Sequence, residues 1–282
     1  MFDVRYHLVS LVAVFLALAL GILMGSVIAG RGTLVERQNA LIEGIQADVN
    51  RIQKENKGLH EELKNSENLK TVLFTALIKE QLNQRKIAIF STTSVPKKIQ
   101  KSLSDLINQA GGQAVFIFLS PDLQKNSSKS LKKLKSFFPE DISSENLKGK
   151  ILGKIASETV NFSDPNFLKA LLDLKMIQSS EDSLQAEAIV LFAGGDEKSE
   201  VFSEIHLPFI QEFQKLGMAV VGIEDSGAKI SHMTFYQEAG ISTIDNIDTT
   251  TGQIALVYVF NGRTGSFGAK PSAQALLPPL RE

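Results

Sequence analysis

The chain has 282 residues, with 30 basic and 31 acidic side chains and a formal net charge of −1 at neutral pH. This balance argues against a nucleic-acid-binding protein, which normally carries a large basic excess, so we expect no nucleic acid among its partners. The absence of cysteine excludes disulfide bonds, zinc–thiolate sites, iron–sulfur clusters and cysteine nucleophiles.

The first region, residues 1–30, contains a long apolar segment. Residues 8–28 carry no charged side chain, and about 20 apolar residues are enough to cross a bilayer as a helix. We therefore predict a single-pass membrane anchor helix, which makes membrane lipid a partner. A cleaved signal peptide is the alternative, because Val27 and Ala29 suit a cleavage site after Ala29. The apolar region of a signal peptide is usually shorter, at roughly 7–15 residues.

The charges that flank this segment do not decide its orientation. Arg5 precedes it, and Arg31 and Arg37 follow it, so the count of positive charges on the two sides is nearly balanced. The N-terminal flank is short and the C-terminal part is large. We therefore expect the C-terminal domain to lie outside the cytoplasm.

Small residues recur at every fourth position of the apolar segment. They are Ala13, Ala17, Gly21, Gly25 and Ala29. Small side chains at this spacing let two membrane helices approach closely. A four-residue step drifts by about 40° per repeat on a 3.6-residue helix, so the stripe favours a crossing pair over a long parallel seam. The pattern predicts self-association, although glycine and alanine are also simply common in membrane helices.

Residues 31–83 predict a long helical coiled-coil rod. Its apolar residues follow the alternating steps of a heptad and form a seam of Leu41, Ile45, Ile52, Leu59, Leu69 and Leu73. Asp48, Glu55 and Glu62 occupy positions on one side of this seam, so the rod departs from a strict two-stranded coiled coil. A solvated single helix is the alternative. Because the rod continues the membrane helix, pairing of both segments predicts a homodimer or a higher homo-oligomer.

Residues 84–270 predict a mostly parallel, open α/β sheet domain, and residues 271–282 form a C-terminal tail. Apolar runs predict strands at 86–90, 113–119, 187–195, 218–224 and 241–245. Helical patterns lie between and after them, at 96–110, 144–156, 165–178, 200–216 and 251–260. Continuous apolar strands that alternate with helices indicate a parallel sheet covered on both faces. Asp248 or Thr249 is expected to cap the last helix.

Polar and glycine residues follow three of the predicted strands. In open α/β sheets, ligands bind beyond the carboxyl ends of the strands. We therefore expect a candidate ligand pocket formed by Gly194, Gly195, Asp225, Asp245 and Asp248. The same residue types also serve in turns and helix N-caps, so a purely structural role is the alternative.

The sequence carries no motif that identifies an enzyme. Patterns of the forms GxGxxG, GxxxxGK[ST], GxSxG and HExxH are absent. We therefore predict no catalytic activity, no catalytic residue and no cofactor. A hydrolase with an acidic site around Asp225 and Asp245 is a distant alternative. The four histidines and five methionines are scattered, and metal ligands stay unassigned. The one adjacent pair, His232 and Met233, is typical of a packed helix turn.

Two stretches at opposite ends of the chain carry a family resemblance. YHLVSLVAVFLALALGILMGS, at residues 6–26, resembles the opening of the mycobacterial copper transport protein B (MctB) family. The stretch STIDNIDTTTGQIALVYVFNGRTGSFGAKPSAQALLPP, at residues 242–279, is similar to the closing motif of that family. The matching positions are Tyr6, His7, Leu8, Asp245, Asn246, Asp248, Gly252, Gly265, Gly268 and Lys270. Where relatives often read Gly-His-Tyr-Gly, this chain reads Gly-Ser-Phe-Gly at residues 265–268.

The resemblance implies a cell-envelope protein that is linked to copper efflux or copper homeostasis, described in mycobacteria as an outer-membrane channel. This resemblance is the only observation in the sequence that suggests copper as a ligand. We therefore expect a homo-oligomeric, membrane-anchored envelope protein implicated in copper transport or homeostasis. The alternative is an envelope scaffold that does not transport metal. The α/β domain of such a scaffold would bind a partner protein, a wall polymer or a small ligand.

Overall fold

The computed structural model describes residues 4–123, 133–138, 144–181, 183–194 and 199–279, with the side chains of residues 29–36 and 144–145 left aside. The chain separates into two compact units, Met1–Lys70 and Thr71–Glu282. Each unit is described by itself.

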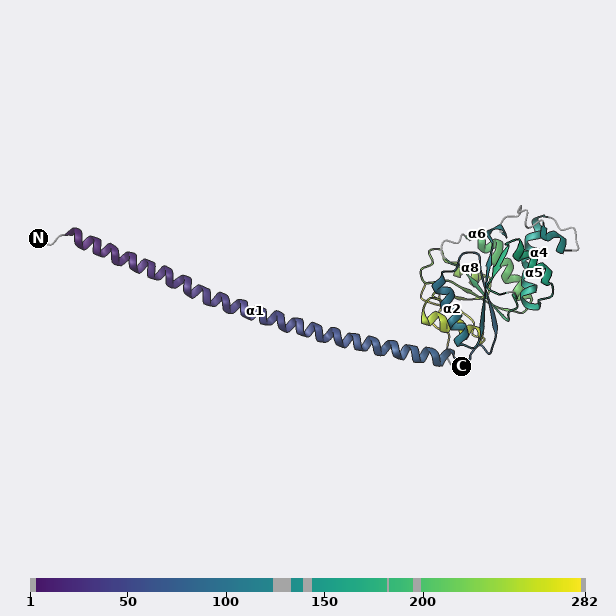
Figure 1. Cartoon of the computed structure of the whole chain (residues 1–282), viewed down its shortest axis with the longest axis horizontal. Helices are drawn as coiled ribbons and strands as arrows, with labels where there is room; N and C mark the ends of the chain where they lie inside the picture. Colours follow the sequence, from purple (N-terminus) through teal and green to yellow (C-terminus); the bar gives the residue numbers. More distant parts are fainter. Residues whose placement is uncertain (1–3, 124–132, 139–143, 182, 195–198, 280–282) are drawn as a thin grey trace. The chain divides into compact units, whose positions relative to one another are not determined.

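One uninterrupted helix, α1 (Val4–Ile78), accounts for the described part of the first unit (Figure 1). Within it, Val4–Ile28 is long and apolar enough to cross a membrane, as judged from length and composition. The small residues from Ala13 to Gly25 lie on this segment with exposed surfaces. Ala29 is helical, but its side chain is outside the described part of the chain.

The predicted rod is helical in a single chain. Its seam residues Leu41, Ile45, Ile52, Leu59, Leu69 and Leu73 are between 51% and 65% exposed. A second chain packed on this seam would remove these side chains from water. A second chain on this seam, and with it the coiled coil, stays a prediction.

The second unit is built on one sheet of seven strands within the described residues, in the order β3-β2-β1-β4-β5-β6-β7. The strands are β1 (Lys86–Ser91), β2 (Gln113–Leu119), β3 (Ile177–Ser179), β4 (Ala188–Phe192), β5 (Ala219–Ile223), β6 (Ser242–Ile244) and β7 (Ser266–Phe267). β3 pairs antiparallel with β2, and the other neighbours pair parallel. The prediction of a mostly parallel α/β sheet is confirmed.

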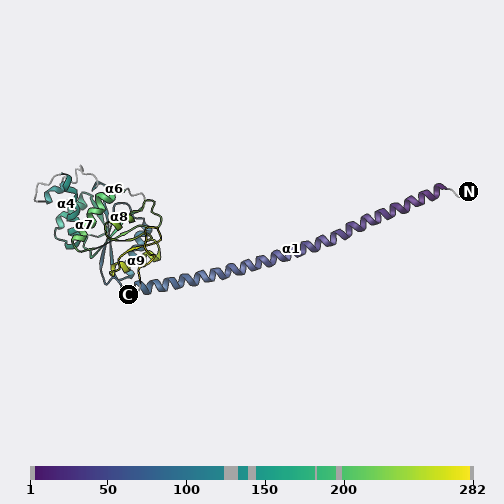
Figure 2. The same cartoon turned by 180° about the vertical axis from the view of Figure 1, so that it is seen from behind.

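Helices cover both faces of this sheet (Figures 1 and 2). On one face, α2 (Lys97–Gln109), α9 (Thr250–Phe260) and the end of α1 pack on a core that includes Ile78, Leu82 and Val190. The other face packs against α4 (Ser144–Asn161), α5 (Pro165–Asp173), α7 (Leu207–Lys215) and α8 (Met233–Glu238). All five residues of β4 are buried, which explains its continuous apolar run.

Short 3₁₀-helices at Pro121–Leu123 and Lys135–Phe137 complete the described elements on the second face. There the predicted helix at 200–216 is divided into α6 (Ser199–Val201), a π-helix (Phe202–His206) and α7. The π segment brings Phe202, Ile205 and His206 into the core.

Three elements correct the sequence-based expectations. The predicted helix at 165–178 ends at Asp173, and the residues Ile177–Ser179 form the antiparallel edge strand β3 instead. Lys175, with φ of 53°, turns the chain between them. Strand β7 and helix α8 were not predicted, because a two-residue strand and a six-residue helix are too short to produce a period in the sequence. Of the two predicted caps of α9, Thr249 is the one that the structure shows, and it accepts from the Gly252 N–H at 3.1 Å.

Candidate functional site

A cleft of about 310 Å³ opens where β5 and β6 end and α2 begins. Its position at the carboxyl ends of parallel strands is the one that open α/β sheets use for ligands. Two residues of the predicted ligand pocket, Asp225 and Asp248, line it. The other lining residues are Pro96, Lys98, Ile99, Ser102, Ser226 and Gly227. Lys98, Ile99 and Ser102 come from the first turns of α2. Sequence reasoning missed their contribution because it compared only the residues that follow strands.

Asp248 joins the two strand ends through Ser226. The Ser226 N–H donates to Asp248 Oδ1 at 2.8 Å, and the Ser226 hydroxyl donates to Oδ2 at 2.6 Å. Burial raises the pKa of Asp248, but these two hydrogen bonds and the charge of Lys98 outweigh it and hold the pKa below 3.8. Asp248 is therefore a carboxylate at neutral pH, and it fixes the position of Ser226 at the cleft.

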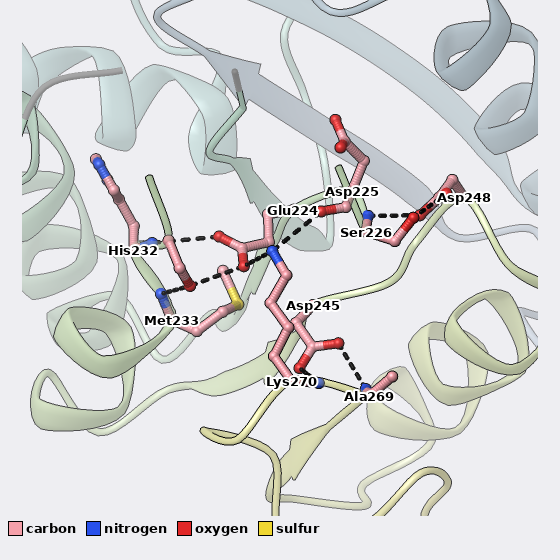
Figure 3. A network of polar contacts seen from close by, with 10 residues as sticks. Glu224, Asp225, Ser226, His232, Met233, Asp245, Asp248, Ala269 and Lys270 are labelled. Carbon is pink, nitrogen blue, oxygen red and sulfur yellow. Dashed lines mark hydrogen bonds and ion pairs between the residues drawn. The ribbon is translucent and has the colours of Figure 1, made fainter. Parts of the chain in front are cut away.

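The carboxyl group of Asp225 is half-buried and lines the same cleft. Figure 3 shows it directed away from Lys270, whose ammonium group instead contacts the Asp225 backbone carbonyl at 3.3 Å. The cleft is therefore lined by the carboxylates of Asp225 and Asp248 and by the Ser226 hydroxyl. Lys98 adds one positive charge to the lining. This arrangement suits a small ligand that presents hydrogen-bond donors.

Beside the cleft lies a buried ion pair. Glu224 is 0% exposed, and its Oε1 accepts from Lys270 Nζ at 2.6 Å and from the Ser231 hydroxyl at 2.7 Å (Figure 3). Its other oxygen, Oε2, accepts from the His232 N–H at 3.2 Å. A buried carboxylate needs such partners, because desolvation of an unpaired charge costs several kcal/mol.

Asp245, a predicted pocket residue, binds the backbone of a loop instead of lining the cleft. Its carboxylate is 2% exposed and accepts from the Ala269 N–H at 2.8 Å and from the Lys270 N–H at 2.9 Å (Figure 3). A Cβ at Gly268 would stand 1.9 Å from Asp245 Oδ1, and the φ of Gly268 is +146°. The close approach therefore requires glycine there.

Of the two predicted glycines, the one that the structure describes, Gly194, does not line the cleft. Gly194 follows β4, and a Cβ there would stand 2.3 Å from the Phe192 ring, so the residue serves packing. Gly195 lies outside the described residues. Of the predicted pocket residues that the structure describes, Asp225 and Asp248 line the cleft. Asp245 is buried beside them.

The imidazoles of His206 and His232 lie in a buried aromatic cluster close to this network. Their ring centroids are 6.2 Å apart, and the Tyr236 hydroxyl is hydrogen-bonded to His206 Nδ1 at 2.6 Å. Burial, together with the neighbouring His232, lowers the pKa of His206 to about 3. In Figure 3 the His232 ring points away from the Met233 sulfur. Among the described residues, no group of three or more His, Asp or Glu is placed to hold a metal ion.

Comparison with known proteins extends the resemblance seen at the two ends. Residues 1–278 match the family described as copper transport outer membrane protein, MctB. Relatives from Mycobacterium bovis and Mycobacterium tuberculosis, both called "Copper transporter MctB", are each 22% identical to this chain over 311 residues. The match covers 98% of this chain and 99% of each relative. The family resemblance is therefore confirmed across nearly the whole chain.

Replacing Lys270 with Met should strip Glu224 of its counter-charge. We expect the free energy of unfolding to fall by about 3–5 kcal/mol, because an uncompensated carboxylate stays buried. Urea unfolding followed by near-ultraviolet circular dichroism measures this. The control is Lys215→Met, whose ion pair with Glu212 is exposed and should change stability by less than about 1 kcal/mol. Equal losses in the two variants would contradict a structural role for the buried pair.

The lowered pKa of His206 predicts a stability that depends on pH. The unfolded chain takes up the proton near pH 6.5, whereas folded His206 does so near pH 3. Its contribution is complete above pH 6.5 and is lost progressively as the pH falls toward 3, by about 1.4 kcal/mol per pH unit. Between pH 7 and pH 5, the free energy of unfolding of the wild-type chain should fall by about 2 kcal/mol more than that of His206→Gln. The control is His60→Gln, at an exposed position of α1, in which the unfolding free energy should depend on pH as it does in wild type. The same pH dependence in His206→Gln would refute the lowered pKa of His206.

Proposed function

This chain belongs to the family described as copper transport outer membrane protein, MctB, and we propose that it is a membrane-anchored cell-envelope protein that acts in copper transport or copper homeostasis. The observation that carries the proposal is the extent of the match. It runs over residues 1–278 and so includes both the apolar helical segment and the α/β unit. The mycobacterial relatives are called copper transporters over almost the same length.

The anchor in this proposal is Val4–Ile28. It crosses the membrane once, with the short N-terminal flank on the cytoplasmic side and the α/β unit outside. A hydrophobic helix of this length is stable in a bilayer because it satisfies its own backbone hydrogen bonds there. The anchor therefore keeps the α/β unit in the cell envelope, where it meets copper before or after the ion crosses a membrane.

Copper is cargo in this proposal, and its passage requires more than one chain. Residues 9–28 carry no charged side chain, and Ser10 and Ser26 are the polar ones among them, so a single helix of this kind offers an ion almost no polar lining. Several copies, or a further membrane protein, are needed to enclose a path. Copper(I) prefers thiolate and thioether ligands, and imidazole also suits copper. Because the chain has no cysteine, its methionines and histidines are the side chains of these kinds that it offers.

Self-association is the second part of the proposal. Along α1, the small-residue stripe of the anchor is followed by the apolar seam from Leu41 to Leu73. Both are exposed where their side chains are described. A crossing pair of anchors followed by paired rods buries the two surfaces together. We therefore propose a homodimer or a higher homo-oligomer.

Deletion of the gene from the source organism tests the copper assignment. We expect growth to stop at a lower copper concentration and cell-associated copper, measured by mass spectrometry, to change relative to wild type. Full-length chain supplied from a plasmid should restore both values. A variant without residues 1–30 should not, because the domain is no longer held at the membrane. Unchanged copper tolerance, with a defect in wall structure or division, would instead support the envelope scaffold.

Substitution of Gly21 and Gly25 by leucine tests self-association through the anchor. Apart from the neighbouring helix backbone, a Cβ at either position meets no atom of its own chain within 4 Å, so a single helix tolerates the change. Two helices that cross there are forced apart, and we expect the oligomer to weaken at least tenfold in analytical ultracentrifugation in detergent micelles. Leu18→Ala and Leu20→Ala together serve as a control outside the stripe. An oligomer size that is unchanged by the double leucine substitution would contradict pairing at the stripe.

A further inference from the structure

A second cleft, of about 440 Å³, lies beside the antiparallel edge of the sheet. It is separate in its lining from the cleft at Asp225. The end of β1 and the loop before α2 form one side, and β2 and β3 form the floor and the other side. Its lining residues are Ser91, Ser94, Val95, Gln100, Phe116, Ile117, Phe118, Gln178, Ser179 and Ser180.

The register of three strands places a row of different side chains on this floor. Ser91 of β1 is paired with Phe118 of β2, and Phe118 is paired with Gln178 of β3. Residues that are directly paired across neighbouring strands project from the same face of a sheet. A hydroxyl, a phenyl ring and an amide therefore stand side by side, with Phe116 two residues along β2 on the same face.

The chemistry of the lining is polar but uncharged. No lining residue has an ionisable side chain, so the cleft holds no counter-charge for a phosphate, a carboxylate or a metal ion. Moving such a charge into it would carry an uncompensated desolvation cost. The ligand that fits is therefore neutral.

The lining combines hydrogen-bonding groups with apolar ring surfaces, and a neutral sugar has both hydroxyl groups and an apolar C–H face. Serine hydroxyls and glutamine amides each donate and accept hydrogen bonds, and so match the hydroxyl groups of a sugar. Phe116 and Phe118 are half-buried and offer an apolar ring surface to the C–H face of a pyranose. The volume of about 440 Å³ falls within the range of ligand pockets.

The loop between the lining residues Ser91 and Ser94 carries unsatisfied hydroxyls. Thr92 Oγ1 and Thr93 Oγ1 are buried and have no hydrogen-bond partner. Thr92 is only 5% exposed. Buried polar atoms normally have a partner in the protein or in bound solvent or ligand. Neither threonine lines the cleft, so these hydroxyls belong to the loop beside it and not to the ligand site.

We propose that this cleft binds an uncharged sugar residue of a glycan. Phe116 and Phe118 hold the apolar face of the ring. The amide of Gln178 and the hydroxyls of Ser91 and Ser94 hold its oxygens, whereas the Ser179 and Ser180 hydroxyls already accept from the backbone N–H groups of Glu181 and Phe116. This binding is independent of copper, so either assignment can fail without the other.

Saturation-transfer difference NMR tests the proposal with the full chain in phosphatidylcholine nanodiscs, which carry no sugar headgroup. The probes are N,N′,N″-triacetylchitotriose and maltotriose as neutral sugars, and uridine monophosphate as a smaller, charged ligand. We expect saturation of the ring protons of at least one neutral sugar and little or none of the nucleotide. Absence of a signal from both sugars, or a stronger signal from the nucleotide, would overturn the proposal.

Two variants tie the signal to this cleft. Gln178→Leu changes an exposed side chain, so the fold should persist, and we expect the affinity for the sugar to fall at least fivefold. Phe118→Ala should lower it at least tenfold. Gln211→Leu on α7 and Phe162→Ala, both exposed and outside this cleft, are the matched controls and should bind as wild type does. Binding that survives Gln178→Leu and Phe118→Ala in a folded chain would place the sugar elsewhere and refute the assignment.

Discussion

The carboxylate of Asp245 imposes the constraint on which the C-terminal third of the α/β unit depends. It lies buried at the end of β6, where an ionised carboxyl group is tolerated only if hydrogen bonds replace its water. The backbone N–H groups of Ala269 and Lys270 supply these bonds. To deliver them, the chain must return from α9, add β7 to the sheet and pass Asp245 at a distance that only glycine at position 268 allows.

The same return carries Lys270 to the second buried carboxylate, Glu224. One loop thus satisfies the ends of two neighbouring strands, and each interaction favours the other because both fix the position of residue 270. Lys270 pairs with Glu224, the first residue after β5. The next two residues, Asp225 and Ser226, face the cleft. Ser226 is then held by Asp248 from the end of β6. The cleft exists in its present form because the buried charges beside it are already paired.

The sequence predicts those parts of the fold that have a local cause. Apolar runs locate β1 and β4 to within a few residues, because strands buried on both faces need apolar residues throughout. The same kind of run locates β2, although alternate residues of β2 are only half-buried. β3 escapes prediction, since its three residues become a strand only by pairing with β2. The role of Asp245 escapes it too. An aspartate after a strand has the same sequence signature whether it faces a ligand or a loop, and its partners lie 24 and 25 residues away in the chain.

The positions that carry the family resemblance at the C-terminal end can be sorted by what they touch. Asp245, Gly268 and Lys270 meet in the network that closes the sheet. Gly252 is required where α9 approaches the Asn246 carbonyl, because a Cβ there would stand 2.2 Å from that oxygen. All of these residues are explained by folding before any ligand is considered. These tail residues therefore close the sheet, whereas Asp225 at one cleft and Gln178 at the other have side chains that no such closure requires, and it is side chains of this kind that a fold leaves available for binding.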